Sequence, residues 1–490
     1  MLKGLKINFW LLGILVFVLL LRLPSFFEPH WYGDEEIYLV LAQMMRRGAV
    51  LYRDIWDNKT PLLYAIYAIS PTLLWAKLSA AFCVIGTVAG SYLFFKELPL
   101  LRKESSYKVW PIVGSLLIGT LLSIPLFEGT IANAELYFTL PIVLGAYLIF
   151  QKKSWLLVGI LAATAFLIKV PAIFDFAGLL LAYFVINRKI KPLIIVAITF
   201  LLSFLILTSY FLTHGALADF ISAAFSQNAS YVAVGSGALS KLSNPLFVKG
   251  LFLLFSLLVL FILFLKKRIS NELLFFSFWF GFSLYGALLS NRSYMHYLLQ
   301  VVPPFTILIL YLVKNFKQNL IFLVTVLCIM YYVLRPFVGA FALDSRTYYQ
   351  NFFDYISERK SWEEYASYFD TRTLDYYEAA QYINHNTYPN DPIFVWGDVA
   401  SVYVISQRPS ATKFIQAHHL TTIPAKNYDL IMERLVKFQP KYILISKIHF
   451  PFPKLEIFVA KNYRPVTAFG DLSILQSISL ASPQTWSPNY

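Results

Sequence analysis

The sequence predicts a polytopic α-helical membrane protein that ends in a small α/β domain outside the membrane. Of its 490 residues, 58% are hydrophobic and only 14% are charged, whereas soluble domains average about 25% charged residues. The mean hydropathy is +0.61. Apolar runs long enough to cross a bilayer recur up to about residue 340, and beyond that point they shorten to the length of strands.

Eleven apolar runs are candidate membrane spans. The hydrocarbon core of a bilayer is about 30 Å thick and needs about 20 apolar residues per helix. The runs lie at 7–23, 73–95, 110–127, 132–150, 154–168, 170–187, 193–213, 247–265, 272–290, 296–313 and 319–340. We therefore expect about 11 transmembrane helices.

Basic residues gather in every second connection between these spans. They are Lys3, Lys6, Lys96, Arg102, Lys103, Lys108, Lys152, Lys153, Arg188, Lys189, Lys191, Lys266, Lys267, Arg268, Lys314 and Lys317. By the positive-inside rule these connections face the cytoplasm. The loop 24–72 and the residues after about 341 are then expected outside the cytoplasmic membrane. The net charge of +14 does not indicate a nucleic-acid partner, because the basic residues form short clusters and no continuous stripe.

The last 150 residues predict the extracytoplasmic α/β domain. Strand-length apolar runs occur at 393–396, 402–405 and 441–446, and helix-like stretches occur at 375–386 and 428–438. Alternating strands and helices are typical of an α/β domain. We expect a transmembrane domain at 1–340, with the first outer loop at 24–72, and a soluble domain at 341–490.

The first outer loop concentrates ionisable groups. They are Asp34, Glu35, Glu36, Arg53, Asp54, Asp57 and Lys59. The acidic triplet precedes an amphipathic run and predicts a helix with acids in its first turn, where the helix dipole stabilises each by about 0.3–1 kcal/mol. This effect explains one or two of the three acids, but not the second cluster in "YRDIWDNKTP".

Other candidates lie at span ends that are expected to face outward. Glu135 stands one turn into an apolar run, and Lys169 lies beside Pro171 although we expect the other span-terminal bases on the inner side. Ionisable groups inside spans are costly and suggest function. An ion pair between Glu135 and Lys169 could also be purely structural. Arg292 and His296 lie at the outer mouth of the tenth span.

Three further acids, Glu128, Asp54 and Asp57, are expected to be solvated loop charges. No Gly-rich phosphate loop, nucleotide fingerprint or Cys/His zinc pattern occurs, so no cofactor is expected. A divalent metal held by Glu28, His30, Glu128 and His296 stays open, but these residues lack a ligand spacing, and we assign no metal site.

Acids and bases together at one membrane face suit a phosphate-bearing lipid substrate. Lys and Arg side chains can hold a phosphate leaving group, and a carboxylate can remove the proton of an attacking hydroxyl.

The first outer loop resembles that of the GT-C superfamily of membrane glycosyltransferases. The resemblance rests on Asp34-Glu35, on Tyr52-Arg53-Asp54 and on Lys59-Thr60-Pro61. These segments are most similar to glycosyltransferase family 39, which contains protein O-mannosyltransferases and lipid A aminoarabinose transferases. The resemblance continues in the segments "NAELYF", "IKVP" and "HYLLQVVPP". A further segment, "IFVWGDVASVYVISQRPSATKF", is similar to the outer domain of bacterial members of the family.

This resemblance implies an inverting glycosyltransferase. A sugar would pass from a polyprenyl-phosphate donor to a hydroxyl of a protein, glycolipid or envelope glycan outside the cytoplasmic membrane. Asp34 would be the catalytic carboxylate, supported by Glu35. The residues expected to bind the donor phosphate are Arg53, Lys59, Lys169 and Arg292, and those expected to bind the acceptor or substrate are Glu135, His296 and Tyr297. The sequence departs from the mannosyltransferase pattern in two respects. No β-trefoil-like repeat is present, and the acidic run is Asp-Glu-Glu, so Glu36 could share the role of Glu35.

Three alternatives remain at this stage. A transferase or ligase that uses a polyprenyl-diphosphate oligosaccharide would often need a divalent metal. A lipid-glycan transporter would place its charges near the bilayer midplane and often carries inverted repeats. A non-catalytic assembly protein would not need the acids of the first loop. The sugar, the acceptor and the oligomeric state do not follow from the sequence.

Overall fold

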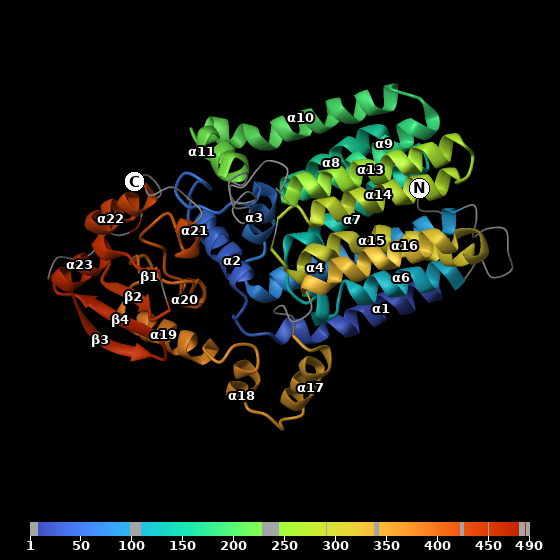
Figure 1. Cartoon of the computed structure of the whole chain (residues 1–490). Coiled ribbons are helices and arrows are strands. Elements are labelled where there is room, and N and C mark those ends of the chain that lie inside the picture. Colours follow the sequence, from blue (N-terminus) through green and yellow to red (C-terminus); the bar gives the residue numbers. More distant parts are fainter. Residues whose placement is uncertain are drawn as a thin grey trace. The chain divides into compact units, whose positions relative to one another are not determined.

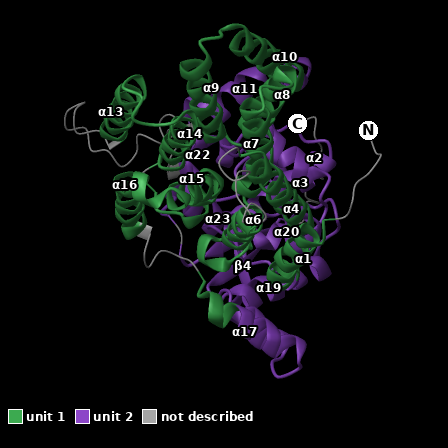
Figure 2. Ribbon diagram, turned by 90° about the vertical axis from the view of Figure 1, so that its right-hand side faces the viewer, with its two compact units in different colours: residues 1–26, 77–207, 232–348 green, residues 27–76, 208–231, 349–490 purple. Residues whose placement is uncertain are grey.

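The chain forms two compact units in a computed structural model that describes residues 8–98, 109–227, 245–290, 292–337, 343–421, 426–448, 450–479 and 486. Unit 1 comprises the described residues of Met1–Phe26, Lys77–Leu207 and Val232–Tyr348. Unit 2 comprises those of Phe27–Ala76, Thr208–Tyr231 and Tyr349–Tyr490 (Figure 2).

Unit 1 is helical. Its elements, some of which begin or end in unit 2, are α1 (Phe9–Arg22), η1 (Leu23–Phe27), α4 (Leu73–Glu97), α6 (Val109–Leu121), η2 (Pro125–Phe127), α7 (Ala134–Phe150), α8 (Trp155–Ile168), η3 (Val170–Ala172), α9 (Ile173–Asn187), α10 (Lys191–Thr213), α13 (Pro245–Leu265), α14 (Asn271–Ala287), η6 (Met295–Val301), α15 (Val302–Lys314), α16 (Phe316–Leu334), η7 (Arg335–Phe337) and α17 (Ser345–Ile356) (Figure 1). Helix α14 packs against α9, α13 and α15, and α7 packs against α8 and α9.

Each of the eleven predicted spans coincides with a helix, which confirms the predicted class of a polytopic helical membrane protein. Seven of the described helical segments are long and apolar enough to cross a bilayer. In the apolar windows of α10, α13 and α16 only 11%, 6% and 11% of the residues are buried. Such a large apolar surface is unfavourable in water and matches a lipid environment.

Unit 2 combines most of the loop 24–72 with the C-terminal part of the chain. Its elements are α2 (Gly33–Arg46), α3 (Pro61–Ala68), α11 (Leu217–Ile221), the π-helical turn η4 (Ser222–Ser226), α18 (Trp362–Ser367), α19 (Thr373–Asn386), β1 (Phe394–Trp396), α20 (Ser401–Ser406), α21 (His418–Thr421), α22 (Lys426–Phe438), β2 (Tyr442–Ser446), α23 (Pro453–Asn462), β3 (Tyr463–Phe469) and β4 (Leu472–Ser477).

A four-stranded sheet in the order β1-β2-β4-β3 forms the centre of the C-terminal part. Strands β1 and β2 are parallel, and the other pairs are antiparallel. Helix α19 packs on β3 and β4, and α23 packs on β3 (Figure 1). The predicted strands at 393–396 and 441–446 and the predicted helices at 375–386 and 428–438 are confirmed, as is the α/β character of this part.

The strand expected at 402–405 is wrong, because these residues belong to the helix α20. Val402, Tyr403 and Val404 are all buried there, and α20 packs against α2 and α19. A four-residue apolar run carries no periodicity that separates a buried helix from a strand. The packing of these side chains therefore decides the conformation against their β-propensity.

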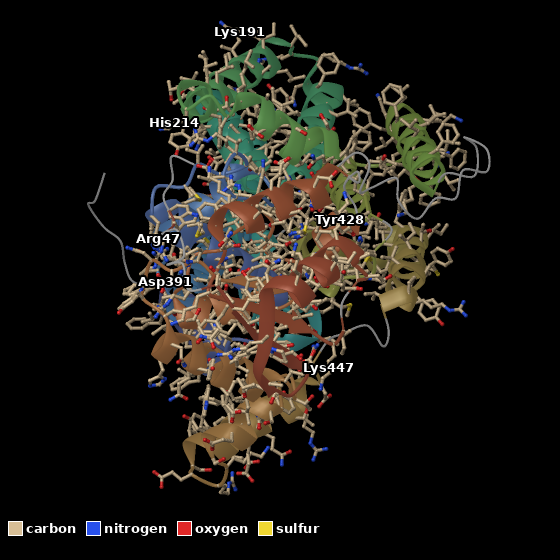
Figure 3. The ribbon with its side chains drawn as sticks, turned by 90° about the vertical axis from the view of Figure 1, so that its left-hand side faces the viewer. Arg47, Lys191, His214, Asp391, Tyr428 and Lys447 are labelled. Atoms are coloured by element: carbon tan, nitrogen blue, oxygen red, sulfur yellow. The ribbon has the colours of Figure 1, made fainter. Side chains whose placement is uncertain are left out.

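Within unit 2 the loop 24–72 packs directly on the C-terminal residues. Helix α2 contacts α20, and the backbone N–H of Trp56 donates to the carbonyl of Lys413 at 3.0 Å. The guanidinium of Arg47 donates to Asn390 and to the carbonyl of Gln407, both at 2.9 Å. Figure 3 labels Arg47 and Asp391, the residue that follows Asn390 in the chain. The predicted boundary between a transmembrane and a soluble domain at residues 340/341 stays a prediction. The two compact units divide the chain differently, because residues of the loop 24–72 belong to unit 2.

Helices α8 and α10 of unit 1 approach each other closely at Gly159. A Cβ atom at this position would lie 2.7 Å from the carbonyl oxygen of Val196 and would overlap the side chain of Thr199. Small residues at such positions allow membrane helices to pack by van der Waals contact. Because the clash involves backbone, it cannot be relieved by rotation of a side chain.

We expect Gly159→Val to lower the thermal stability of the detergent-solubilised protein, at a cost of about 1–3 kcal/mol, which is typical of overpacking. The matched control is Gly13→Val, because a Cβ at Gly13 meets no atom within 4 Å. Unfolding followed by fluorescence measures both variants. An equal melting temperature for the two would contradict the close approach of α8 and α10.

Candidate functional site

Residues 33–61 build the first group of candidates from two helix starts. Helix α2 begins at Gly33, so Asp34, Glu35 and Glu36 occupy its first turn, as predicted. Pro61 is the first residue of α3 and Thr60 its N-cap, which suits proline because the first helical N–H needs no partner within the helix. Unlike the amphipathic helix expected, α2 is buried on all sides from Glu35 to Met44.

Asp34 and Lys59, predicted on separate parts of the loop, lie together. The Lys59 ammonium is 3.7 Å from Oδ1 of Asp34 and lies over the ring of Tyr38, 5.3 Å from its centroid. The Tyr38 hydroxyl donates to Oδ2 of Asp34 at 3.1 Å. The Asp34 side chain keeps 30% of its surface exposed and that of Lys59 keeps 17%, so both groups can meet a ligand.

Asp57 lies on the other side of Lys59 and is fully buried. Its Oδ2 is 3.7 Å from the Lys59 ammonium and accepts a hydrogen bond from the Tyr64 hydroxyl at 2.7 Å. Its Oδ1 accepts from the backbone N–H of Asn58 at 2.7 Å. The expectation of a solvated Asp57 is therefore wrong. A carboxylate removed from water needs such partners, and here they come from within seven residues of Asp57.

The other loop candidates have different partners. Arg53 forms a two-pronged ion pair with Asp54, with both nitrogen–oxygen distances 2.9 Å, and donates to the carbonyl of His214, which Figure 3 labels. Glu36 accepts from the His30 ring at 2.9 and 3.0 Å. Glu35 is 1% exposed.

Unit 1 contains a second group. The Lys169 ammonium donates to Glu135 at 2.5 Å and lies 4.4 Å from the centroid of the Tyr297 ring. Lys169 lies at the break between α8 and η3, and Glu135 lies in the first turn of α7. These three residues, predicted from different outer connections, thus form one contact group.

His296 extends this group to Glu128. The His296 ring packs edge-on against Tyr297 with centroids 4.7 Å apart, and its Nδ1 lies 2.5 Å from Oε2 of Glu128. Glu128 is only 6% exposed, so the expectation of a solvated charge is wrong here as well. Its partner comes from η6, 168 residues away in the sequence. Arg292 lies beside these residues in the chain and donates to the Tyr294 hydroxyl at 3.5 Å.

Sequence reasoning missed two bases at span ends predicted to face outward. Arg22 and Lys77 are both fully buried. Arg22 donates to the carbonyls of Leu122 and Gly129, and Lys77 donates to the carbonyl of Thr130 at 3.1 Å. Lys169 is therefore not exceptional among the bases at these ends. The signal available in the sequence was their position within apolar runs.

A fully buried acid, Asp175 of α9, was also missed. Its carboxylate accepts from the Trp279 indole at 2.7 Å and from Gln300 at 2.5 Å. Gln300 belongs to η6, so this acid ties the segment that carries His296 and Tyr297 to α9. No group of three or more His, Cys, Asp or Glu that could hold a metal occurs among the described residues.

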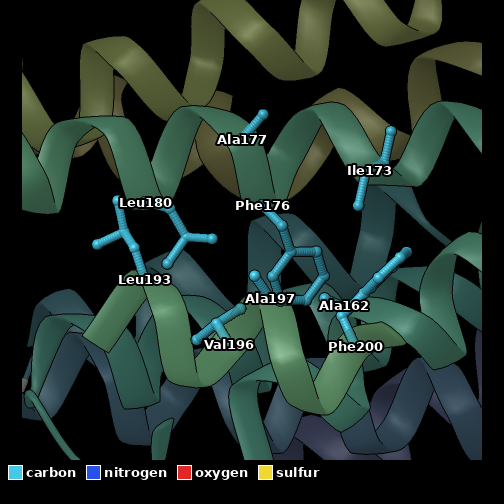
Figure 4. Close-up of a pocket in the computed structure, with 9 residues that line it drawn as sticks. All are labelled: Ala162, Ile173, Phe176, Ala177, Leu180, Leu193, Val196, Ala197 and Phe200. Carbon is cyan, nitrogen blue, oxygen red and sulfur yellow. The ribbon is translucent and has the colours of Figure 1, made fainter. Parts of the chain in front are cut away.

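An apolar pocket of about 190 Å³ lies among α8, α9 and α10 (Figure 4). Ala162, Phe176, Val196 and Phe200 are among the residues that line it, and all of its lining side chains are hydrocarbon. Such a pocket offers no group that could orient a sugar or hold a phosphate. The ionisable groups, and not this pocket, are the candidates for chemistry.

His419 of α21, from the C-terminal part of the chain, lies beside one of the loop acids. Its Nε2 is 3.6 Å from Oδ1 of Asp57, and its ring packs edge-on against Trp56 with centroids 5.1 Å apart. Burial, and secondarily the positive charges of His418 and Lys59, lower the pKa of His419 well below 6.5, although Asp398 and Asp34 act in the opposite direction. Burial and the charge of Asp57 raise the pKa of Tyr64, so its hydroxyl stays protonated and can donate.

The fold is similar over nearly its whole length to two solved structures of one protein. The crystal structure of ArnT from Cupriavidus metallidurans bound to undecaprenyl phosphate superposes with a TM-score of 0.58, covering 98% of this chain and 100% of that chain at 15% identity. The apo state of the same protein gives a TM-score of 0.56, with coverage of 97% and 99% at 14% identity. This likeness confirms the predicted GT-C fold.

Residues 376–473 match a family model described as "Putative competence-induced protein Ccs4 C-terminal domain". These residues include β1, β2 and β3 and only the first two residues of β4. No curated protein sequence matches the chain.

Acidification should destabilise the protein through His419. With a folded-state pKa below the unfolded value of 6.5, the unfolded chain binds the proton first. The free energy of unfolding then falls as the pH drops below about 6.5, by at most about 1.4 kcal/mol per pH unit for one proton. His419→Gln should lose less thermal stability than the native protein between pH 7 and pH 5. The control is His385→Gln, which changes an exposed histidine and should follow the native protein. If the melting temperatures of the native protein and His419→Gln fall equally between pH 7 and pH 5, His419 is not the source of the acid destabilisation.

Proposed function

We propose that the protein is an inverting glycosyltransferase that moves a sugar from a polyprenyl-phosphate donor to an acceptor hydroxyl. The observation that carries the proposal is the partly exposed carboxylate of Asp34 beside the ammonium of Lys59, 3.7 Å away. The fold supports it, because the similar ArnT structure contains undecaprenyl phosphate. In this proposal the chain is a relative of glycosyltransferase family 39, and its loop 24–72 and C-terminal part face the outside of the cytoplasmic membrane.

Asp34 acts as the general base. The acceptor hydroxyl forms a bond to the anomeric carbon while the bond from that carbon to the phosphate oxygen breaks, and the hydroxyl proton passes to Asp34. Attack from the face opposite to the leaving phosphate inverts the anomeric centre. A positioned base of this kind contributes about 10²- to 10⁴-fold to the rate. Glu35, buried in the same helical turn, supports Asp34.

Lys59 and Lys169 are the proposed donor-binding cations, since the leaving phosphate gains negative charge as the bond breaks. Each already lies beside a carboxylate, Lys59 beside Asp34 and Lys169 beside Glu135. Arg53 and Arg292 are assigned supporting roles toward the phosphate. Glu135, His296 and Tyr297 are assigned to substrate or acceptor, because their carboxylate, imidazole and phenol groups can hydrogen-bond sugar hydroxyls.

Asp34→Asn should abolish transfer while binding of undecaprenyl phosphate remains. The amide is isosteric with the carboxylate but cannot accept the proton, so we expect the rate to fall by about 10²- to 10⁴-fold. The assay incubates purified protein with polyprenyl-phosphate-linked sugars and envelope extract, and mass spectrometry follows donor consumption. The matched control is Asp429→Asn, whose side chain is 59% exposed in a surface ion pair. Undiminished consumption by Asp34→Asn would refute the catalytic role.

Chelation distinguishes monophosphate from diphosphate donors. Enzymes that use diphosphate donors often hold the leaving group with a divalent metal, whereas the proposed site uses ammonium groups. We therefore expect EDTA to change the rate of donor consumption by less than about twofold. Loss of activity in EDTA and its recovery with Mg²⁺ or Mn²⁺ would favour the diphosphate alternative. Comparison of envelope glycans from cells with and without the gene would then identify the sugar and acceptor.

A further inference from the structure

We propose that His419, from the C-terminal part of the chain, is a positioning residue that acts through Asp57 on the phosphate-binding ammonium of Lys59. The inference rests on the proposed function. It gives the α/β part of unit 2 an indirect role in holding the donor phosphate. The residues concerned all belong to unit 2.

Two carboxylates flank the ammonium of Lys59. The ammonium is 3.7 Å from Asp34 and 3.7 Å from Asp57, but only Asp34 has a large exposed fraction, 30% against 0%. Asp34 can move or change protonation during a reaction. Asp57, held by the Tyr64 hydroxyl and by the N–H of Asn58, is the fixed reference that determines where the ammonium lies.

The C-terminal residues close the remaining side of Asp57. Nε2 of His419 lies 3.6 Å from Oδ1, slightly beyond hydrogen-bond distance. The His419 side chain is 6% exposed. Trp56, the residue before Asp57, packs on Phe414 with ring centroids 5.6 Å apart and also on the His419 ring. The segment 414–419 therefore contacts Trp56 at both of its ends.

A neutral imidazole suits this position better than a cation. A second positive charge beside Asp57 would compete with Lys59 for the same carboxylate and would repel the ammonium. The groups whose charges act on His419 are His418, Lys59, Asp398, Asp34 and Asp57. Burial keeps the pKa of the ring low, so Asp57 directs its charge to Lys59 at neutral pH.

The test compares two amide substitutions in the full-length protein. The side-chain amide of His419→Gln can occupy the place of Nε2, whereas that of His419→Asn can reach only the place of Nδ1. We expect His419→Asn to weaken binding of undecaprenyl phosphate in detergent micelles about tenfold, because a displaced ammonium makes a poorer charge-assisted hydrogen bond to the phosphate. His419→Gln should stay within about threefold of the native protein. His385→Gln and His385→Asn, on the exposed face of α19, are the controls and should bind as the native protein does.

A double-mutant cycle with Lys59→Met identifies the route of the effect. If His419 acts through Lys59, His419→Asn causes no further loss of binding in the Lys59→Met background. A purely structural role would lower the melting temperature and weaken binding equally in both backgrounds. Native-like binding by His419→Asn, or a loss of equal size in the Lys59→Met background, overturns the inference while the proposed function stands.

If the native protein neither binds undecaprenyl phosphate nor consumes polyprenyl-phosphate sugars, the proposed function fails and this inference fails with it. If His419→Asn does not fold, Asp57→Asn carries the test. This isosteric change removes the carboxylate that joins His419 to Lys59, so we expect about tenfold weaker binding. Unchanged binding by Asp57→Asn overturns the inference.

Discussion

The placement of several candidate groups depends on the cost of withdrawing a carboxylate from water. Asp57, Glu135 and Glu128 are at most 6% exposed, and a buried charge is tolerated only with close partners. Asp57 lies beside Lys59, Glu135 beside Lys169 and Glu128 beside His296. The last two pairs join residues from different connections of unit 1, so charge compensation helps to bring those connections together.

Hydropathy carried most of the information about the fold. A helix that passes lipid must satisfy its own backbone and present hydrocarbon, so each span is visible as a run of about 20 apolar residues. For this reason all eleven runs correspond to helices. The run at 402–405 was assigned wrongly because four buried residues show no period. Strands β3 and β4 went unnoticed because their side chains are mostly half-buried or exposed.

The candidate site was predictable where chemistry-bearing residues lie in one segment, and not where partners come from distant segments. Asp34 and Lys59 are 25 residues apart in one loop, and residue type alone marked both. The burial of Asp57 depends on Tyr64 and on His419, and no local pattern at "IWDNKTP" announces a histidine more than 350 residues later. Arg22 and Lys77 escaped notice for the same reason, since their partners are backbone carbonyls of the segment 122–130.

The arrangement around Lys59 also suggests how binding energy is directed to the transition state of the proposed reaction. Before transfer, two carboxylates share one ammonium, and an incoming phosphate meets a group that is already partly neutralised. When Asp34 takes the acceptor proton it loses its negative charge, at the moment when the phosphate oxygen gains one. Lys59 then faces one carboxylate fewer and one phosphate charge more. An interaction that strengthens only as the bond breaks lowers the barrier, whereas one of equal strength throughout would only tighten binding of the donor. Asp57 must stay in place while this exchange occurs, and the hydrogen bonds from the Tyr64 hydroxyl and the N–H of Asn58 hold it there.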